Sequence, residues 1–506
     1  MKKRILTLML IMVLIISVFS GCGRQQSTAA DDDPSSQEDV AAVTDPASDL
    51  IEAPSSSRED VVDAAAVDSK DLIHTDPDDP DNLRAENDQK TEPVILGDEQ
   101  FDEYLPLLKG RKVALFSNHS GIVGDKLYDV NGNDIQYPED NLLVPFGQDA
   151  DGNEVVYGTH ILDALIEQGV NVTAIFSPEH GFRGTEDAGT VVGDSVDEKT
   201  GVPILSLYAS TNTHYPSSDS MEKFDVLVVD MQDVGLRYYT YYISMYYLMD
   251  ACAQYEKEVI ILDRPNPNGY YVDGPVLQEE YYSGVGRLPI PVVHGMTWGE
   301  LAQMINGEGW LSTGADSCSL TVIPCKNYTH QTRYMLIRRP SPNLKDMQAV
   351  YLYASTCFFE NTAVSVGRGT DYPFEIYGSP YLQGIAGNEY SFMPESMEGA
   401  AAPTFEGVTC YGRNLRDIPA KQILTGQIDL QYLFDAYQDM QEYDPAISFF
   451  GTQDGSGHYF IDYLFGTDEV RIRMEEGDSA EEIRASWQEE VDAFKVQRRP
   501  YLLYEE

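Results

Sequence analysis

The sequence predicts an α/β fold, with a Rossmann-like, doubly wound parallel sheet followed by a smaller α/β domain. Over the first half of the body, short runs rich in β-branched and aromatic residues alternate with longer helix-like segments. Several of the runs are almost continuously apolar, which is typical of parallel strands buried on both faces. Ligands bind beyond the carboxyl ends of such strands, so the loops that follow them should carry the functional side chains.

The predicted elements can be placed along the chain by this alternation. Strands are expected at 112–117, 172–176, 202–207, 224–231 and 258–263, with helices at 159–168 and 238–254. Later, a helix at 297–306, strands at 320–324 and 349–353, and helices near 430–437 and at 480–496 are expected. Thr297 and Glu300 form a capping box at the start of the predicted helix at 297–306. We therefore divide the body into domains at 96–288 and 289–506.

Residues 1–22 are typical of a bacterial lipoprotein signal peptide. Basic residues at 2–4 precede an apolar run at 5–18, which is shorter than the about 20 residues of a membrane-spanning helix. The ending Ser20-Gly21-Cys22 resembles a lipobox, which implies cleavage before Cys22 and acylation of that residue. We expect an exported protein of the cell envelope, lipid-anchored to the outer face of the cytoplasmic membrane. The alternative is a plain secreted protein that is cut elsewhere.

Residues 23–95 form a predicted acidic, disordered tether, because Ser, Ala, Asp, Glu and Pro dominate and apolar periodicity is absent. The whole chain has a formal net charge of −49, which disfavours nucleic acid as a partner. Of six cysteines, five remain after Cys22, without a C-x-x-C pair. Neither a zinc site nor a disulfide framework is therefore indicated, although a Cys318 to Cys325 bridge is possible.

The loop after the strand at 172–176 presents the most reactive set of side chains. Pro178 ends ladder pairing, and the glycines that follow permit a tight turn over the strand end. Glu179, His180 and Arg183 are thereby placed together at the carboxyl end of a strand. Three further strands end in similar polar clusters, at 117–119, 230–238 and 263–269. Four such clusters along one sheet edge indicate a binding site.

Long motifs in these loops match a known family. The runs S-P-E-H-G-F-R-G, D-V-L-V-V-D-M-Q-D-V-G-L-R-Y-Y-T-Y, L-D-R-P-N-P-N-G, P-S-P-N-L and S-V-G-R-G-T-D-Y-P-F-E-I-Y-G-S-P resemble the exo-β-N-acetylmuramidase family. The resemblance extends over about 107–504. It implies a Rossmann-like domain, a smaller α/β domain and a cleft between them. It also implies release of N-acetylmuramic acid from the non-reducing ends of peptidoglycan fragments.

Hydrolysis of a glycosidic bond requires a proton donor and a group that stabilises or traps the oxocarbenium-like centre. Glu179 is the predicted acid, because a carboxyl beside strand ends and Phe182 can have a raised pKa. Asp230 and Asp233 compete for the second role, unless they hold backbone NH groups or arginines. Tyr208, Tyr238 or the 2-acetamido group of the sugar could serve instead. The catalytic set predicted is Glu179, Tyr208 and Asp230.

Recognition of muramic acid calls for arginine, since its lactyl ether carries a carboxylate that a guanidinium binds with two hydrogen bonds. Four arginines lie in the motifs: Arg183, Arg237, Arg264 and Arg368. Each of them could instead form an internal ion pair with a neighbouring Asp. The predicted substrate-binding set is His180, Arg183, Gln232, Asp233, Arg237, Tyr238, Asp263, Arg264, Asn266, His294, Asn343, Glu360 and Arg368.

Other classes of protein remain open. One is a non-catalytic, lipid-anchored receptor for muropeptides, which would use the same cleft and arginines. Another is a metal-dependent hydrolase built on Glu179, His180 and Asp230, but no H-E-x-x-H spacing supports it. A G-x-G-x-x-G motif after the first strand is also missing, so no metal and no cofactor are predicted. The oligomeric state is left open.

Overall fold

The computed structural model describes residues 92–137, 141–178, 182, 195–207, 215–315 and 317–506. The chain separates into two units, Met1–Thr91 and Glu92–Glu506, and all the described residues belong to the second. The predicted signal peptide and nearly all of the predicted tether lie outside the described residues. Ile95 already belongs to the folded body, since it exchanges two backbone hydrogen bonds with Lys326. Among the described helices, none has the length and apolar character needed to span a membrane.

The central element is a seven-stranded sheet with the order β12-β9-β8-β1-β5-β7-β6. Its strands are β1 (Lys112–Ser117), β5 (Asn171–Ser177), β6 (Ser195–Val196), β7 (Pro203–Ser206), β8 (Val226–Asp230), β9 (Glu258–Leu262) and β12 (Ser319–Ile323). All neighbours are parallel except β6, which runs antiparallel to β7. The predicted parallel sheet is confirmed.

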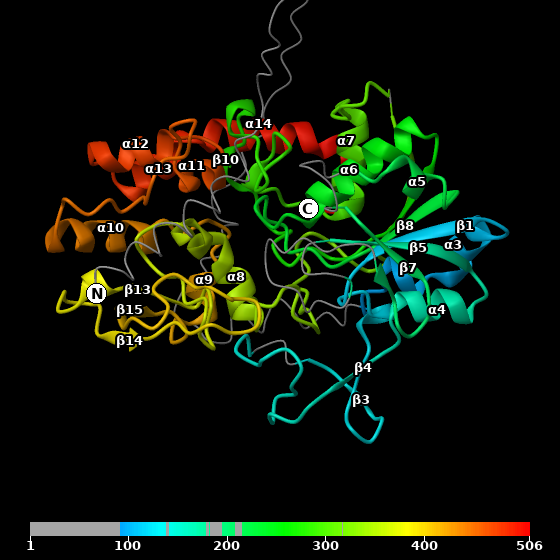
Figure 1. Ribbon diagram of the computed structural model, residues 1–506, viewed down its shortest axis with the longest axis horizontal. Helices are drawn as coiled ribbons and strands as arrows, with labels where there is room; N and C mark the ends of the chain where they lie inside the picture. The colour runs from blue at the N-terminus through cyan, green and yellow to red at the C-terminus, as the bar shows by residue number, and fades with distance from the viewer. Residues whose placement is uncertain (1–91, 138–140, 179–181, 183–194, 208–214, 316) are drawn as a thin grey trace, which may run out of the picture. The chain divides into compact units, whose positions relative to one another are not determined.

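Helices cover both faces of this sheet (Figure 1). Val113 and Leu115 of β1 pack with α3 (Phe101–Leu108) and α4 (Ile161–Glu167). Ala114 and Phe116 belong to the core on the other face, with α6 (Tyr241–Gln254) and α7 (Trp298–Gly307). Because successive side chains alternate across a strand, each strand supplies both cores. This arrangement is a doubly wound sheet.

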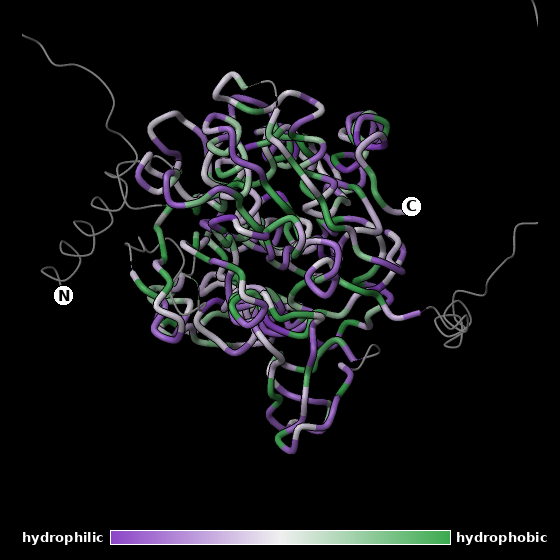
Figure 2. The backbone as a smooth tube through the Cα atoms, turned by 90° about the vertical axis from the view of Figure 1, so that its right-hand side faces the viewer, coloured by the Kyte–Doolittle hydropathy of each residue, from purple (hydrophilic) through white to green (hydrophobic). Residues whose placement is uncertain are grey.

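An antiparallel arm is inserted between β1 and α4. It consists of β2 (Leu127–Tyr128), β3 (Asp134–Ile135) and β4 (Val156–Tyr157), and it projects from the body in Figures 1 and 2. Ile122, Leu127 and Ile337 form a small core at its base. The arm therefore stands beside the carboxyl end of β1, where the site is expected.

The second half of the body contains smaller sheets and a group of helices. Its strands are β10 (Asp273–Val276) paired with β11 (Pro291–Val293), and β13 (Ile376–Ser379), β14 (Tyr390–Phe392) and β15 (Cys410–Asn414) in a second antiparallel sheet. Its helices are α8 (Met347–Thr356), α9 (Ala420–Ile423), α10 (Gln431–Tyr443), α11 (Phe460–Phe465), α12 (Glu469–Glu476), α13 (Ala480–Ser486) and α14 (Gln488–Arg498). Short helices also occur along the whole body: η1 (Gly97–Glu99), η2 (Val123–Asp125), α5 (Ser218–Met221), η3 (Glu279–Tyr281), η4 (Cys357–Phe359), η5 (Pro380–Leu382) and η6 (Arg499–Tyr501).

Two predicted elements differ from the structure. The segment 349–353 is not a strand but part of α8, which begins where the Asp346 carboxylate accepts a hydrogen bond from the backbone N of Ala349 at 2.9 Å. Every residue of α8 is buried, so the run has no polar face that would reveal a helical period. The predicted helix at 480–496 is broken into α13 and α14 at Trp487, whose Nε1 donates to Asp273 Oδ1 at 2.8 Å.

Several smaller predictions can also be compared with the structure. The capping box of α7 is confirmed, with Thr297 and Glu300 satisfying each other's backbone NH groups. β12 pairs with β9 although it lies beyond residue 288, so the main sheet crosses the predicted domain boundary. The five cysteines after Cys22 are buried and free, and the possible Cys318 to Cys325 bridge is not formed.

Candidate functional site

The carboxyl ends of the central strands meet at one edge of the sheet. Ser117 at the end of β1 lies opposite Asp230 at the end of β8, and Ser177 of β5 lies opposite Ser206 of β7. The loops predicted to carry function therefore start side by side. This placement is confirmed.

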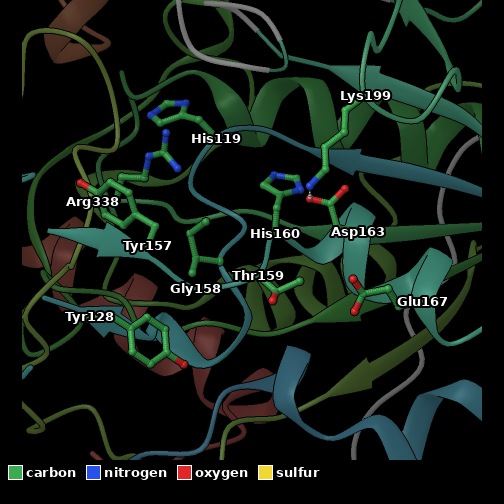
Figure 3. Close-up of a pocket in the computed structure, with 11 residues that line it drawn as sticks. His119, Tyr128, Tyr157, Gly158, Thr159, His160, Asp163, Glu167, Lys199 and Arg338 are labelled. Atoms are coloured by element: carbon green, nitrogen blue, oxygen red, sulfur yellow. Dashed lines mark hydrogen bonds and ion pairs between the residues drawn. The ribbon is translucent and has the colours of Figure 1, made fainter. Parts of the chain in front are cut away.

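A pocket of about 460 Å³ opens at this edge, which is within the range of small-molecule sites (Figure 3). It is formed by the end of β1, the arm, α4 and two later segments. Its lining residues are His119, Ile122, Tyr128, Tyr157, Gly158, Thr159, His160, Asp163, Glu167, Lys199 and Arg338. In Figure 3, His119, Tyr157 and Arg338 gather at one end, and Asp163, Glu167 and Lys199 lie at the other.

Hydrogen bonds hold the walls of the pocket in place. His119 Nε2 donates to the carbonyl of Arg339 at 2.8 Å, and Tyr239 donates to the carbonyl of Pro340 at 2.7 Å. The segment 338–340 is thereby fixed above the sheet edge. His160 caps α4 through Nδ1, while its Nε2 donates to the carbonyl of Asn118 at 2.8 Å. Phe182 packs edge-on against His160, with the ring centroids 5.2 Å apart.

The two ends of the pocket differ in charge. At one end, Lys199 Nζ and Asp163 Oδ2 form an ion pair at 2.6 Å, and Glu167 adds a second carboxylate. At the other, the guanidinium carbon of Arg338 lies 4.4 Å from the centre of the Tyr157 ring. Burial raises the pKa of the Tyr157 phenol, and the positive charge of Arg338 partly offsets this effect. The second end therefore combines an aromatic face with a cation.

Asp230 and Arg264 are held together in a buried charge network. Arg264 Nε donates to Asp230 Oδ1 at 2.6 Å, and Nη2 donates to Oδ2 at 3.2 Å. The same guanidinium reaches Asp98 at 2.6 Å and Asp125 at 2.9 Å. Burial raises the pKa of Asp98 well above its ordinary value, while Arg264 lowers it. These contacts favour the internal ion pair over the predicted roles of Arg264 in binding and Asp230 in catalysis.

Asp263 and His294 are also engaged inside the protein. The Asp263 carboxylate accepts hydrogen bonds from Thr297 Oγ1 at 2.7 Å, from the backbone N of Gly299 at 2.9 Å and from Tyr504 at 2.6 Å. Burial raises its pKa to about 6. His294 Nδ1 accepts from the backbone N of Met296, and burial lowers the pKa of its imidazole to about 3, so it is neutral. Asp263 therefore fixes the start of α7, and His294 fixes the chain just before it.

Arg237 and Tyr238 donate to backbone carbonyls. Arg237 is fully buried, and its Nη atoms donate to the carbonyls of Pro275, Ile290 and Leu464 at 2.7 to 2.9 Å. Burial lowers the pKa of this guanidinium to about 10. The Tyr238 hydroxyl lies 3.0 Å and 2.8 Å from the carbonyls of Tyr353 and Ala354. Arg237 is thus directed at main chain and not at a ligand carboxylate.

Asp233 and Asn266 line a small cavity of about 10 Å³, enough for one water molecule. Asp233 Oδ1 accepts from the backbone N of Gly235 at 2.6 Å, whereas Asp233 Oδ2 and Gln232 Oε1 have no hydrogen-bond partner among the described residues. Burial raises the pKa of Asp233 to about 7. Asn266 Nδ2 donates to the carbonyl of Met296 at 2.9 Å.

The predicted residues of the second half lie in two separate contacts. Asn343 Nδ2 donates to the carbonyl of Gly399 at 2.8 Å. Glu360 and Arg368 form an ion pair, with 2.6 Å between Oε1 and Nε. The guanidinium carbon of Arg368 also lies 5.0 Å from the centre of the Phe374 ring. None of these three lines the pocket at the sheet edge.

Glu179, His180, Arg183 and Tyr208 lie outside the described residues, as does Cys22. Pro178 and Phe182, which flank the first two, are described and buried.

None of the eleven residues that line the pocket belongs to the predicted catalytic or substrate-binding sets. Two of them carried a signal: His119 lies in the predicted polar cluster at 117–119, and Arg338 stands two residues before the P-S-P-N-L motif. Among the described residues, no three His, Cys, Asp or Glu side chains cluster as a metal site would require.

Comparisons with known proteins agree over most of the body. The family model for the N-terminal domain of the exo-β-N-acetylmuramidase NamZ matches residues 153–348, and the C-terminal model matches 351–504. The peptidoglycan β-N-acetylmuramidase NamZ of Bacillus subtilis is 37% identical over 361 residues, which are 68% of this chain and 82% of that protein.

Two crystal structures of DUF1343 family proteins from Bacteroides fragilis have a similar fold. One has 49% identity and a TM-score of 0.68, covering 82% of this chain and 99% of its own. The other has 26% identity and a TM-score of 0.63, covering 81% of this chain and 99% of its own.

Proposed function

Because the chain belongs to the exo-β-N-acetylmuramidase NamZ family, we propose that it is an exo-acting glycoside hydrolase. Its substrate is peptidoglycan, and it releases N-acetylmuramic acid from the non-reducing ends of peptidoglycan fragments. The observation that carries this proposal is the pocket at the carboxyl edge of the sheet, whose wall residue His160 contacts Phe182. Phe182 follows the predicted acid, Glu179, by three positions in the sequence.

The chemistry is divided between a proton donor and a second group. Glu179 donates the proton to the leaving oxygen in this proposal. Both oxygens of Asp230 are bound by Arg264, which makes Asp230 the weaker candidate for the second group. That role then falls to Tyr208, Asp233 or the 2-acetamido group of the sugar itself.

We also propose that the protein is exported and attached to the cytoplasmic membrane through a lipid on Cys22, facing the cell envelope. The support is the basic, apolar and small-residue order of residues 1–22. Metabolic labelling with a palmitate analogue should mark the protein and should fail for Cys22→Ala. Labelling of both proteins, or of neither, would contradict this anchor.

The experiment that tests the activity is a release assay on a chromogenic β-glycoside of N-acetylmuramic acid. The N-acetylglucosamine analogue, which lacks only the lactyl ether, serves as the matched substrate. Release from the muramic compound alone supports an exo-muramidase that recognises the lactyl group. Binding of both sugars without release would instead identify a muropeptide receptor.

A further inference from the structure

The small cavity of about 10 Å³ lies between the carboxyl ends of β8 and β9 and the start of α7. Val229 of β8, Ile261 of β9 and Trp298 of α7 are among the residues that line it. Of the described residues, none lines both this cavity and the larger pocket at the sheet edge. Its volume is about that needed by one water molecule, so a larger ligand does not fit.

Most polar side-chain atoms around this cavity already have partners. Arg264 contacts three carboxylates, Thr297 donates to a carboxylate, and Asn266 bonds two backbone groups. Two side-chain atoms of the lining remain, the donor Trp298 Nε1 and the acceptor Asp233 Oδ2. Neither has a hydrogen-bond partner in the part of the chain that the structure describes.

These two groups are buried and face each other. Trp298 is 4% exposed and Asp233 is 8% exposed, so bulk solvent does not satisfy them. The Trp298 ring is stacked on Phe116 with an interplanar angle of 11°, which fixes the plane of its N–H group. Burial raises the pKa of Asp233 to about 7, and the indole N–H is among the groups that lower it. Polar groups that face each other without a direct hydrogen bond are often bridged by water.

We infer that this cavity is a binding site for one water molecule, which accepts a hydrogen bond from Trp298 Nε1 and donates one to Asp233 Oδ2. Water suits both groups, because it donates as well as accepts. Polar cavities of this size hold water, whereas empty cavities are apolar. A metal cation does not suit the site, since an indole nitrogen only donates and much of the wall is apolar.

The water makes Asp233 a positioning residue for the loop that follows β8. Asp233 Oδ1 accepts from the backbone N of Gly235 at 2.6 Å. Gly235 has a φ of 75°, and a Cβ at this position would collide with the side chain of Asn266. Through the water, Oδ2 joins this tight turn to the start of α7. The next step rests on the proposed function: with both oxygens engaged, Asp233 is not the second chemical group, and the other candidates remain.

The tryptophans offer a direct test, because the chain contains only three: Trp298, Trp310 and Trp487. A nitrogen-15 spectrum of the full-length protein therefore has three indole signals, which Trp→Phe variants assign. Trp487 is the internal control, since its Nε1 donates directly to Asp273 Oδ1 at 2.8 Å. Rotating-frame Overhauser measurements, which separate proximity from proton exchange, should detect a bound water at Trp298 and none at Trp487. Absence of the effect at Trp298 would overturn the inference.

A crystal structure of the wild type that resolves ordered waters gives a second test. One density peak within about 3.2 Å of both Trp298 Nε1 and Asp233 Oδ2 supports the site. An unfilled cavity, or a direct hydrogen bond between the two side chains, contradicts it. Because both tests use the wild type, they stand even if a variant fails to fold.

Variants test whether the two residues act through the same water. Asp233→Asn should shift the indole signal of Trp298 and leave that of Trp487 in place. On the muramic glycoside, Asp233→Asn and Trp298→Phe should each lower kcat by less than about 10-fold, the usual size of one hydrogen bond. Trp298→Phe keeps the aromatic ring against Phe116, and the double variant should be no worse than the weaker single variant.

The kinetic result also separates this inference from the proposed function. A fall of about 10² or more in Asp233→Asn alone would assign Asp233 to the chemistry and overturn its positioning role. If the wild type releases no sugar from the muramic glycoside, the proposed function fails. The Overhauser measurement and the crystal structure still decide the water site in that case.

Discussion

Arg264 binds Asp230 through two hydrogen bonds at the carboxyl end of β8, with both side chains almost completely buried. Asp98 and Asp125 contact the same guanidinium, so three carboxylates share one positively charged partner. These residues come from segments far apart in the chain. The network therefore joins the start of the body, the arm base and two strands at the edge that forms the site.

Arg264→Ala should destabilise the protein by about 3 to 5 kcal/mol at pH 7, because it leaves three buried carboxylates without a counter-charge. The loss should be smaller at pH 5, because burial raises the pKa values of Asp98 and Asp125 and these two carboxyls take up protons as the pH falls. Urea unfolding at the two pH values measures both effects. Arg339→Ala removes a more exposed pair and should cost less than about 1 kcal/mol. Similar stability of the two variants would show that the network contributes little.

Glu179→Gln should lower kcat on the muramic glycoside by about 10² to 10⁴, because an amide cannot protonate the leaving oxygen. The melting temperature and the affinity for free sugar should stay near those of the wild type. Stopped assays at high enzyme concentration, with a melting curve of the same sample, check both statements. Unchanged kcat would exclude Glu179 as the acid, and loss of stability would indicate a structural carboxylate.

Asp233→Asn should change how stability depends on pH. Burial raises the pKa of Asp233 from 3.8 to about 7, so the folded protein holds this proton more tightly than the unfolded chain. Its contribution to stability is fully present below about pH 4 and is lost as the pH rises through 7. Between these values it should lower the unfolding free energy by up to about 1.4 kcal/mol per pH unit.

Urea unfolding of the wild type and Asp233→Asn from pH 5 to 8 tests this slope. Asp263 and Glu375 also have raised pKa values, about 6 and 8, but they are present in both proteins and their effects cancel in the difference. The stability difference should shift in favour of the variant as the pH rises. Parallel curves would mean that Asp233 is ionised in the folded protein across this range.

Trp487→Phe should destabilise the protein by about 1 to 3 kcal/mol, because it removes the hydrogen bond to the buried Asp273 carboxylate and keeps most of the aromatic packing. Trp310→Phe is the control, since that tryptophan is only partly buried and does not contact Asp273 through its indole nitrogen. Thermal unfolding of both variants gives the comparison. Equal effects would assign the role of Trp487 to packing alone.

The strands of the central sheet could be predicted because they are short, apolar and separated by polar loops. The observed β1 matches the predicted range, and β5, β8 and β9 differ by two residues or fewer at each end. The segment 349–353 was predicted wrongly, because α8 is buried on every side and its residues show no amphipathic period. The break at Trp487 was also missed, since it depends on Asp273, which lies in β10.

The site was less predictable than the fold. That polar residues gather at the carboxyl edge follows from strand direction, and the geometry of Ser117 and Asp230 agrees. Which of them face a pocket does not follow from their order. Four polar motif residues are buried and bound to other parts of the protein: Asp230, Asp263, Arg237 and Arg264. Arg338 and Tyr157, in contrast, line the cavity.

Strand periodicity, turn residues and motif spacing are local properties, so the residue order alone was enough for the doubly wound sheet, for its functional edge and for the family resemblance. The partner of each charged side chain is a long-range property. Arg264 meets Asp98, and Arg338 meets Tyr157, only after the sheet, the arm and the segment 338–340 have packed together. Burial then decides the outcome, because a buried charge must be paired within the protein, whereas a charge beside a cavity can bind a ligand.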